Sequence, residues 1–213
     1  MLKSIDLIKT IPNLNHRYTT KESRQNTVAI LGSSRNSEAI DKYLKVSSEV
    51  TRHFVENGYN VVHGCGTKGV MGAVYESAKK YSEKNSFGKP VKNLAVVVEP
   101  LWGDENLVDC IPIGKARTEA ERITKFAKVA DSFVIFPGSA GTLQEATTLI
   151  QNNHYLKDDE AKKVILFGFD FWEGLVSQYK KLFDMKLLKE NPIGKLFHIV
   201  DTKEDIFKLI SRK

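Results

Sequence analysis

The sequence predicts an α/β fold: a Rossmann-like, doubly wound parallel sheet with helices on both faces, in a single domain. Short, continuously apolar segments alternate along the chain with longer segments of helical periodicity, which is typical of a parallel sheet covered on both faces. No internal repeat, low-complexity tract or linker interrupts this alternation. We therefore expect an N-terminal arm over residues 1–26 and one domain over residues 27–213.

The first predicted strand, Thr27–Leu31, is apolar and ends in Gly32, Ser33 and Ser34. A helix follows, with Ser37 suited to its N-cap and Gly58 to the position after its end. Further strands are expected at residues 59–64, 93–100, 132–136 and 162–168. Further helices are expected at residues 69–82, 117–130, 142–153 and 171–185, and a last strand and helix share residues 197–210.

Two segments show no clear periodicity. Residues 82–90 resemble a surface loop. Residues 101–115 contain Pro112 and two glycines, and a long irregular segment inside a compact domain is often a functional loop.

Composition limits the classes of partner. The net charge is +6 and the pI is near 9.1. This excess of positive charge either favours anionic ligands or only keeps the protein surface soluble. The lysines are scattered and no nucleic-acid-binding motif is evident, so we expect no nucleic-acid partner. No long apolar run predicts a signal peptide or a membrane span, which indicates a cytoplasmic protein with no membrane partner.

The two cysteines, Cys65 and Cys110, form no disulfide framework in the sequence and are expected to be free thiols.

Small residues follow three of the predicted strands. They are "GSS" from Gly32, "GCGTKG" from Gly64 and "PGSAGT" from Pro137. Because ligands bind beyond the carboxyl ends of parallel strands, one site formed by all three loops is expected. Glycine allows close approach of a phosphate to the backbone, and the N-terminus of a helix attracts it.

The segment Gly64 to Gly69 also satisfies the GxGxxG pattern of NAD-binding enzymes. That pattern alone is weak evidence for NAD binding. It requires an acidic residue roughly 20 positions further on, whereas Glu99 lies 30 positions beyond Gly69. An NAD-dependent enzyme therefore stays a minor alternative.

Glu145 has two interpretations. With Thr142 it forms a capping-box pattern, in which Thr142 caps the helix and Glu145 reaches back to the backbone. It is also a candidate chemical group beside the third loop, and the helix dipole would keep a carboxylate in the first turn ionised.

Two arginines and one histidine are further candidates. Arg122 shares a flank of its helix with Phe126 and either binds an anion or lies at the margin of the core. Arg117, near the start of that helix, is a second candidate for anion binding. His63 ends a buried strand, where a histidine is more often a hydrogen-bonded core residue than a catalytic base.

Taken together, these motifs resemble the Lonely Guy (LOG) phosphoribohydrolases and their bacterial nucleotide-nucleosidase relatives, which often carry the label possible lysine decarboxylase. The matching residues are Gly32-Ser33-Ser34, Gly69-Val70-Met71-Gly72, Glu121-Arg122 and "PGSAGTLQE" from Pro137 to Glu145. The resemblance covers residues 27–169, and the last motif is the most specific.

The resemblance implies a homodimer that hydrolyses the N-glycosidic bond of a nucleoside 5′-monophosphate to free base and ribose 5-phosphate, without metal or cofactor. It places the catalytic residues at Arg122 and Glu145. It implies that the 5′-phosphate is bound by Gly138, Ser139, Gly141 and Thr142 and that the pocket wall is completed by Gly32, Ser33, Gly66 and Met71. Arg117 remains a substrate-binding candidate because of its place near the helix start. A carboxylate there would stabilise the positive charge that develops on the sugar.

The chain departs from the family pattern at Ser139, which replaces a glycine, and at Ile123, which replaces a lysine. Both departures motivate an alternative function, a binding protein of the same fold that holds a nucleotide or the molybdenum cofactor without hydrolysing it. Lysine decarboxylation is set aside, because the His-Lys pair that anchors pyridoxal phosphate is missing from the sequence.

Overall fold

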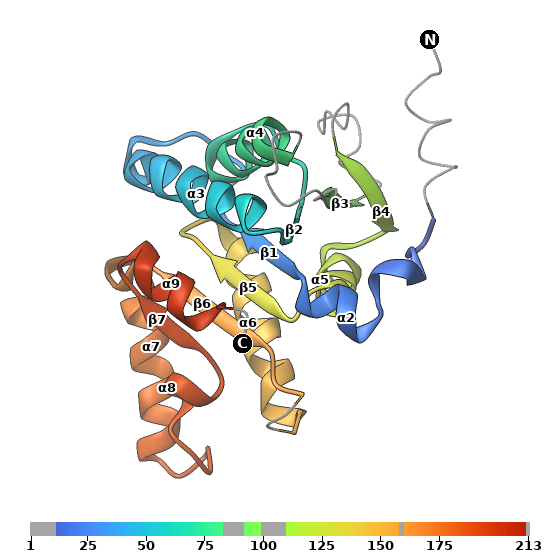
Figure 1. Cartoon of the computed structure of the whole chain (residues 1–213). Helices are drawn as coiled ribbons and strands as arrows, with labels where there is room; N and C mark the ends of the chain where they lie inside the picture. The colour runs from blue at the N-terminus through green and yellow to red at the C-terminus, as the bar shows by residue number, and fades with distance from the viewer. Residues whose placement is uncertain (1–11, 83–91, 99–109, 158–159, 212–213) are drawn as a thin grey trace.

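The structure, a computed structural model, describes residues 12–82, 92–98, 110–157 and 160–211. Its centre is a sheet of parallel strands in the order β4-β3-β2-β1-β5-β6-β7 (Figure 1). The strands are β1 (Thr27–Leu31), β2 (Asn60–His63), β3 (Asn93–Val98), β4 (Ile111–Ala116), β5 (Ser132–Ile135), β6 (Lys163–Phe167) and β7 (His198–Val200). The predicted Rossmann-like fold is confirmed.

The strand order reverses beside β1. The chain runs outward from β1 through β2 and β3 to β4, then returns to place β5 on the other side of β1. Such a reversal opens a crevice at the carboxyl ends of the strands, where ligands of open α/β sheets bind.

Helices cover both faces of the sheet because successive side chains of each strand point to opposite faces. In β1, Ala29 and Leu31 pack towards α5 and α6, whereas Val28 and Ile30 pack towards α3 and α4. The longer helices are α3 (Glu38–Glu56), α4 (Gly69–Ser82), α5 (Glu119–Val129), α6 (Ala140–Tyr155) and α7 (Phe169–Asp184). The shorter ones are η1 (His16–Tyr18), α2 (Lys21–Gln25), α8 (Pro192–Lys195) and α9 (Lys203–Leu209).

Several predicted helix signals act as expected. The Ser37 side chain accepts a hydrogen bond from the Ala39 N–H at the start of α3. Gly58, just beyond the end of α3, has φ = 78°, a conformation that glycine adopts without steric cost. Thr202 and Asp205 have the three-residue spacing of a capping box, and Thr202 caps α9 by accepting from the Asp205 N–H.

Strand β4 corrects one expectation. Residues 111–116 form the edge strand of the sheet, within a segment that we expected to be irregular. Pro112 is tolerated because an edge strand needs no hydrogen bond from every N–H. The arm covers part of that edge, since the Asn15 N–H donates to the Ile113 carbonyl at 2.7 Å. Residues 83–90 of the predicted loop, Glu99 and residues 101–109 of the irregular segment lie outside the described residues. Ser82 is the last residue of α4.

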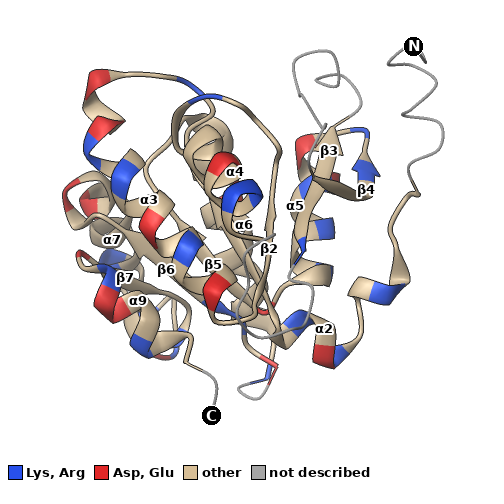
Figure 2. Ribbon diagram, turned by 45° about the horizontal axis from the view of Figure 1, so that its top comes forward, with Lys and Arg blue, Asp and Glu red and all other residues tan. Residues whose placement is uncertain are grey.

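Figure 2 shows Lys and Arg distributed over many elements, mostly with Asp or Glu nearby. The excess positive charge is therefore not gathered on one face of the elements drawn. Within the described ranges, every helix is too short or too polar to cross a membrane.

Candidate active site

A cavity of about 780 Å³ lies at the carboxyl ends of the strands, where the strand order reverses. The loops after β1, β2 and β5 all line it, as the three glycine-containing loops predicted. Eight of the predicted residues lie in its wall: Gly32, Gly66, Met71, Arg122, Ser139, Gly141, Thr142 and Glu145. Six further residues line it that the sequence analysis did not select: Ser34, Arg35, Asn36, Thr67, Lys68 and Glu119.

The first turn of α6 forms one end of the cavity. Its N-cap is Ser139, not Thr142, and the Ser139 side chain makes no capping hydrogen bond. The backbone N–H groups of Ala140, Gly141 and Thr142 have no backbone partner in the described part of the chain. The expected Thr142–Glu145 capping box is therefore absent. Gly141 and Thr142 line the cavity at this uncapped helix start, an arrangement that suits an anion.

Helix α4 also begins at the cavity, but two N–H groups of its first turn are occupied. The Gly69 N–H donates to the Asn36 side-chain oxygen at 2.9 Å, and the Met71 N–H donates to the Ser33 carbonyl at 3.0 Å. Of these two helix starts, α6 is therefore the better anion site.

Three predicted binding residues do not line the cavity. Ser33 is buried and its hydroxyl bonds to the backbone of Arg35. Gly138 lies behind Thr142, since a Cβ there would be 2.2 Å from the Thr142 hydroxyl oxygen. Arg117 is exposed, and its N–H donates to the Glu121 carboxylate at the start of α5.

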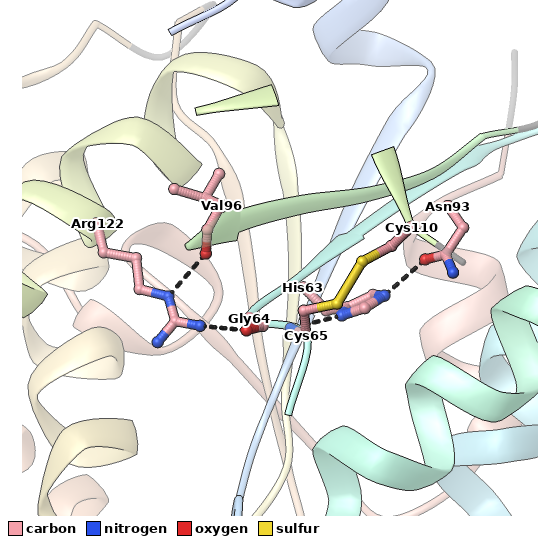
Figure 3. The surroundings of a disulfide bond; sticks show 7 residues. All are labelled: His63, Gly64, Cys65, Asn93, Val96, Cys110 and Arg122. Carbon is pink, nitrogen blue, oxygen red and sulfur yellow. Dashed lines mark hydrogen bonds between the residues drawn. A yellow bond between two sulfur atoms is a disulfide. The ribbon is translucent and has the colours of Figure 1, made fainter. Parts of the chain in front are cut away.

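Arg122 is buried between the ends of β2 and β3 (Figure 3). Its Nε donates to the Val96 carbonyl at 3.0 Å and one terminal nitrogen donates to the Gly64 carbonyl at 2.6 Å. Its other terminal nitrogen lies 3.5 Å from the Glu119 carboxylate. The guanidinium is thus held rigidly in the cavity wall, and its positive charge is fixed relative to Glu145.

Gly64 is required by this arrangement. A Cβ at residue 64 would lie 1.9 Å from the Arg122 guanidinium and 2.5 Å from the Met71 methyl group. The first glycine of the GxGxxG pattern therefore makes room for the Arg122 side chain. Its presence is explained without assuming that the loop binds a dinucleotide.

Gly64→Ala should lower the free energy of unfolding by about 1–3 kcal/mol, because Arg122 has to leave two backbone carbonyls to admit the methyl group. Urea denaturation measures the loss. Gly174→Ala is the matched control, since nothing lies within 4 Å of a Cβ at this exposed position of α7. Equal stabilities of the two variants would contradict the packing described for Arg122.

Glu145 lies on the second turn of α6 and faces the cavity. Burial raises the pKa of its carboxyl group to about 7, while the charge of Arg122 opposes the rise and that of Glu119 adds to it. The expectation of a fully ionised carboxylate was therefore wrong, because the loss of hydration outweighs the helix dipole. Near neutral pH this group both gives up and accepts a proton readily.

This pKa affects the pH dependence of stability. Between its ordinary value of 4.5 and about 7, the folded form of Glu145 holds a proton that the unfolded form has lost, so its contribution to stability falls as pH rises. His63, with its pKa lowered by burial to about 4, contributes in the opposite direction between pH 4 and 6.5.

Glu145→Gln removes the contribution of Glu145 to the pH dependence of stability and leaves that of His63. The variant should therefore gain stability relative to the wild-type chain, on the order of 2 kcal/mol, between pH 5 and pH 8. Urea denaturation of both proteins at each pH measures this difference. A difference that stays constant over the whole range would show that folding does not raise the pKa of Glu145.

His63 is a buried structural residue, as its position at the end of a strand predicted. Its Nδ1 accepts from the Cys65 N–H at 2.8 Å, so Nε2 carries the proton and donates to the Asn93 side-chain oxygen at 2.6 Å. With both ring nitrogens occupied and the ring fully buried, His63 supports the turn next to Arg122 (Figure 3).

The two cysteines correct another expectation, because Cys65 and Cys110 form a disulfide with Cα atoms 7.4 Å apart. The bond joins the turn after β2 to the residue before β4, beside Tyr75, Ala95 and Val97. We expected free thiols because two cysteines make no disulfide framework. The pairing depends on β4, which the sequence analysis did not predict.

The described residues contain no group of three or more His, Cys, Asp or Glu side chains placed to hold a metal ion. Of the additional lining residues, Arg35 follows the first glycine loop and Lys68 lies within the second. Their charge and position were signals that the sequence analysis did not use.

Comparison with known proteins identifies the family of the chain. A family model described as possible lysine decarboxylase matches residues 71–210. Cytokinin riboside 5′-monophosphate phosphoribohydrolase LOG of Oryza sativa subsp. japonica is 30% identical over 122 residues, which is 56% of this chain and 46% of that protein. The chain thus spans under half the length of this relative.

Two solved structures share the fold. The molybdenum cofactor binding protein of Rippkaea orientalis has a TM-score of 0.55 and 21% identity, covering 86% of this chain and 94% of that one. The molybdenum cofactor carrier protein of Chlamydomonas reinhardtii has a TM-score of 0.58 and 15% identity, covering 87% and 98%. At these identities the likeness concerns the fold alone. Because the family model spans more than half of the chain, the chain belongs to the LOG family, whose model is described as possible lysine decarboxylase.

Proposed function

We propose that this protein hydrolyses the N-glycosidic bond of a nucleoside 5′-monophosphate, releasing the free base and ribose 5-phosphate. One observation carries the proposal: the open first turn of α6 and the Glu145 carboxyl group face the same cavity from the same helix. Gly141 and Glu145 are four residues apart, about 6 Å along the axis, a separation that one pentose spans.

In the proposed complex, the N–H groups of Ala140, Gly141 and Thr142 bind the 5′-phosphate, and the Ser139 hydroxyl adds a further donor. The ribose then lies beside Glu145. Breaking the C–N bond develops positive charge on the sugar, which the ionised carboxyl group stabilises while it orients or deprotonates the attacking water.

Arg122 has a positioning role in this proposal. Its hydrogen bonds go to Val96 and Gly64, and its charge favours the ionised form of Glu145. Without that charge, burial alone would raise the pKa of Glu145 further and reduce the ionised fraction at neutral pH. Ile123, which replaces the lysine of the family pattern, is buried in the core and is not part of the cavity wall.

A carrier protein that binds a nucleotide or the molybdenum cofactor without hydrolysis is the second candidate. It is favoured by the fold of the two molybdenum cofactor proteins and by Ser139 at the cavity. The two functions differ in what happens to the ligand. An enzyme releases the base, whereas a carrier returns the ligand intact after overnight incubation.

Incubation with AMP and a panel of other nucleoside monophosphates, followed by chromatography, distinguishes them. We expect free base and ribose 5-phosphate in equal amounts from at least one nucleotide. Folded protein that releases base from none of them would contradict the hydrolase assignment. The homodimer expected from the family is a separate proposal, which light scattering after size-exclusion chromatography tests.

Gly141→Ala should affect AMP binding without lowering the stability of the fold. No atom lies within 4 Å of a Cβ at this position in the structure, and alanine favours a helix over glycine by up to about 1 kcal/mol. The added methyl group would occupy space that we assign to the phosphate. We expect unchanged or higher stability together with at least tenfold weaker AMP binding, measured by calorimetry. Unchanged AMP affinity would place the phosphate elsewhere.

A further inference from the structure

Two basic side chains line the cavity and have no role in the binding of the 5′-phosphate proposed above. Arg35, after β1, and Lys68, after β2, are both exposed in the cavity wall. Within the described residues, neither side chain takes part in a salt bridge or a hydrogen bond. Their charges are therefore available to a ligand.

The backbone holds these two residues close together. Asn36, next to Arg35, accepts a hydrogen bond from the N–H of Gly69, next to Lys68, at 2.9 Å. The contact is tight, since a Cβ at residue 69 would lie 2.5 Å from the Arg35 carbonyl oxygen. The Ser33 hydroxyl also bonds to both the N–H and the carbonyl of Arg35. Both side chains thus leave the backbone from neighbouring, fixed points.

The carboxylates of the cavity do not compensate this positive charge. Glu119 lies 3.5 Å from the Arg122 guanidinium, and Glu145 has its pKa raised to about 7 by burial. Two cations held near each other repel, and an anion between them removes that repulsion. The cavity volume of about 780 Å³ lies in the upper part of the range of small-molecule sites.

We propose that the preferred ligand carries a second phosphoryl group in addition to the 5′-phosphate, and that Arg35 and Lys68 bind this second group. The inference rests on the proposed function, because it assigns the 5′-phosphate to the first turn of α6. It adds to the nucleoside 5′-monophosphates of the proposed function a class of preferred ligands with two phosphoryl groups, attached either as a 5′-diphosphate or as separate 5′ and 3′ esters.

Equilibrium binding tests the inference. Calorimetry with AMP, ADP and adenosine 3′,5′-bisphosphate is carried out on the Glu145→Gln protein, in which turnover is suppressed. We expect ADP or the bisphosphate to bind at least about tenfold more tightly than AMP, and the tighter of the two identifies where the second group is attached. The Arg35→Ala/Lys68→Ala variant should remove that preference, reducing AMP affinity by a smaller factor.

The control is Arg17→Ala/Lys128→Ala, which removes the same charge from two exposed residues that do not line the cavity. It should keep the preference for the doubly phosphorylated ligand. Equal affinity for all three nucleotides would overturn the inference, as would an equal loss for AMP and for the doubly phosphorylated ligands in Arg35→Ala/Lys68→Ala.

The failure of the proposed function is distinguishable from the failure of this inference. If AMP binds and is hydrolysed by the wild-type protein without any preference for a second phosphoryl group, the inference alone is wrong. If a doubly phosphorylated nucleotide binds through Arg35 and Lys68 but no base is released from any nucleotide, the inference holds and the hydrolase assignment fails. If no nucleotide binds, both are wrong.

Discussion

Glu145→Gln should reduce kcat for AMP hydrolysis at least about 100-fold while changing the affinity for AMP only a few-fold. Glutamine keeps the size of the side chain but neither stabilises the positively charged sugar as an anion nor accepts a proton from water. Initial rates of base release and calorimetric affinities measure the two effects. Because Glu145 lies one turn beyond the proposed phosphate site, its loss should affect the chemical step far more than binding.

The matched control is Glu173→Gln on the exposed surface of α7, which removes a carboxylate that does not line the cavity. It should keep the wild-type rate. If Glu145→Gln were as active as this control, Glu145 would have no part in the chemistry. A loss of affinity as large as the loss of rate would instead identify Glu145 as a binding residue.

Loss of the Cys65–Cys110 bond should have the largest effect on stability. The bond closes a segment of 45 residues, and the loss of that constraint on the unfolded chain corresponds to about 4 kcal/mol. Urea denaturation of Cys65→Ala/Cys110→Ala and of the wild-type chain, each with and without dithiothreitol, measures it. The reductant should destabilise the wild-type chain and leave the double variant unchanged.

That comparison separates the cross-link from the packing of the side chains, because reduction leaves both cysteines in place. If dithiothreitol changed neither the stability nor the intact mass of the wild-type protein, the two thiols would be free. In that case the turn beside Gly64 would be held by His63 and Arg122 without the help of the disulfide.

Much of the fold was predictable because its elements are specified locally. Strand β1 has the predicted bounds, and α3 starts at the predicted cap, Ser37. The alternation of apolar strands and helices required a parallel sheet, and the glycine loops had to meet where the strand order reverses. The position of the candidate site follows from this topology.

The remaining features depend on contacts between distant segments. Strand β4 contains Pro112 and is stable only because β3 and the N-terminal arm lie on its two sides. The disulfide in turn depends on β4. The pKa of Glu145 depends on how deeply α6 is buried at the cavity, which no local pattern reveals.

The start of α6 could not be predicted from its local sequence either. Thr142 and Glu145 have the spacing of a capping box, but the N-cap of α6 is Ser139, three residues before Thr142. Thr142 is instead buried against Gly138. The interpretation of Glu145 as a capping residue was therefore wrong. Its side chain is left to face the cavity.

The central claim is that the first turn of α6 binds the 5′-phosphate and thereby places the ribose against Glu145. A crystal structure of the Glu145→Gln protein with AMP tests it most directly. We expect phosphate oxygens about 2.8–3.0 Å from the N–H nitrogens of residues 140–142, with the anomeric carbon of the ribose next to residue 145. A phosphate bound away from α6, or a ribose turned away from residue 145, would contradict the account.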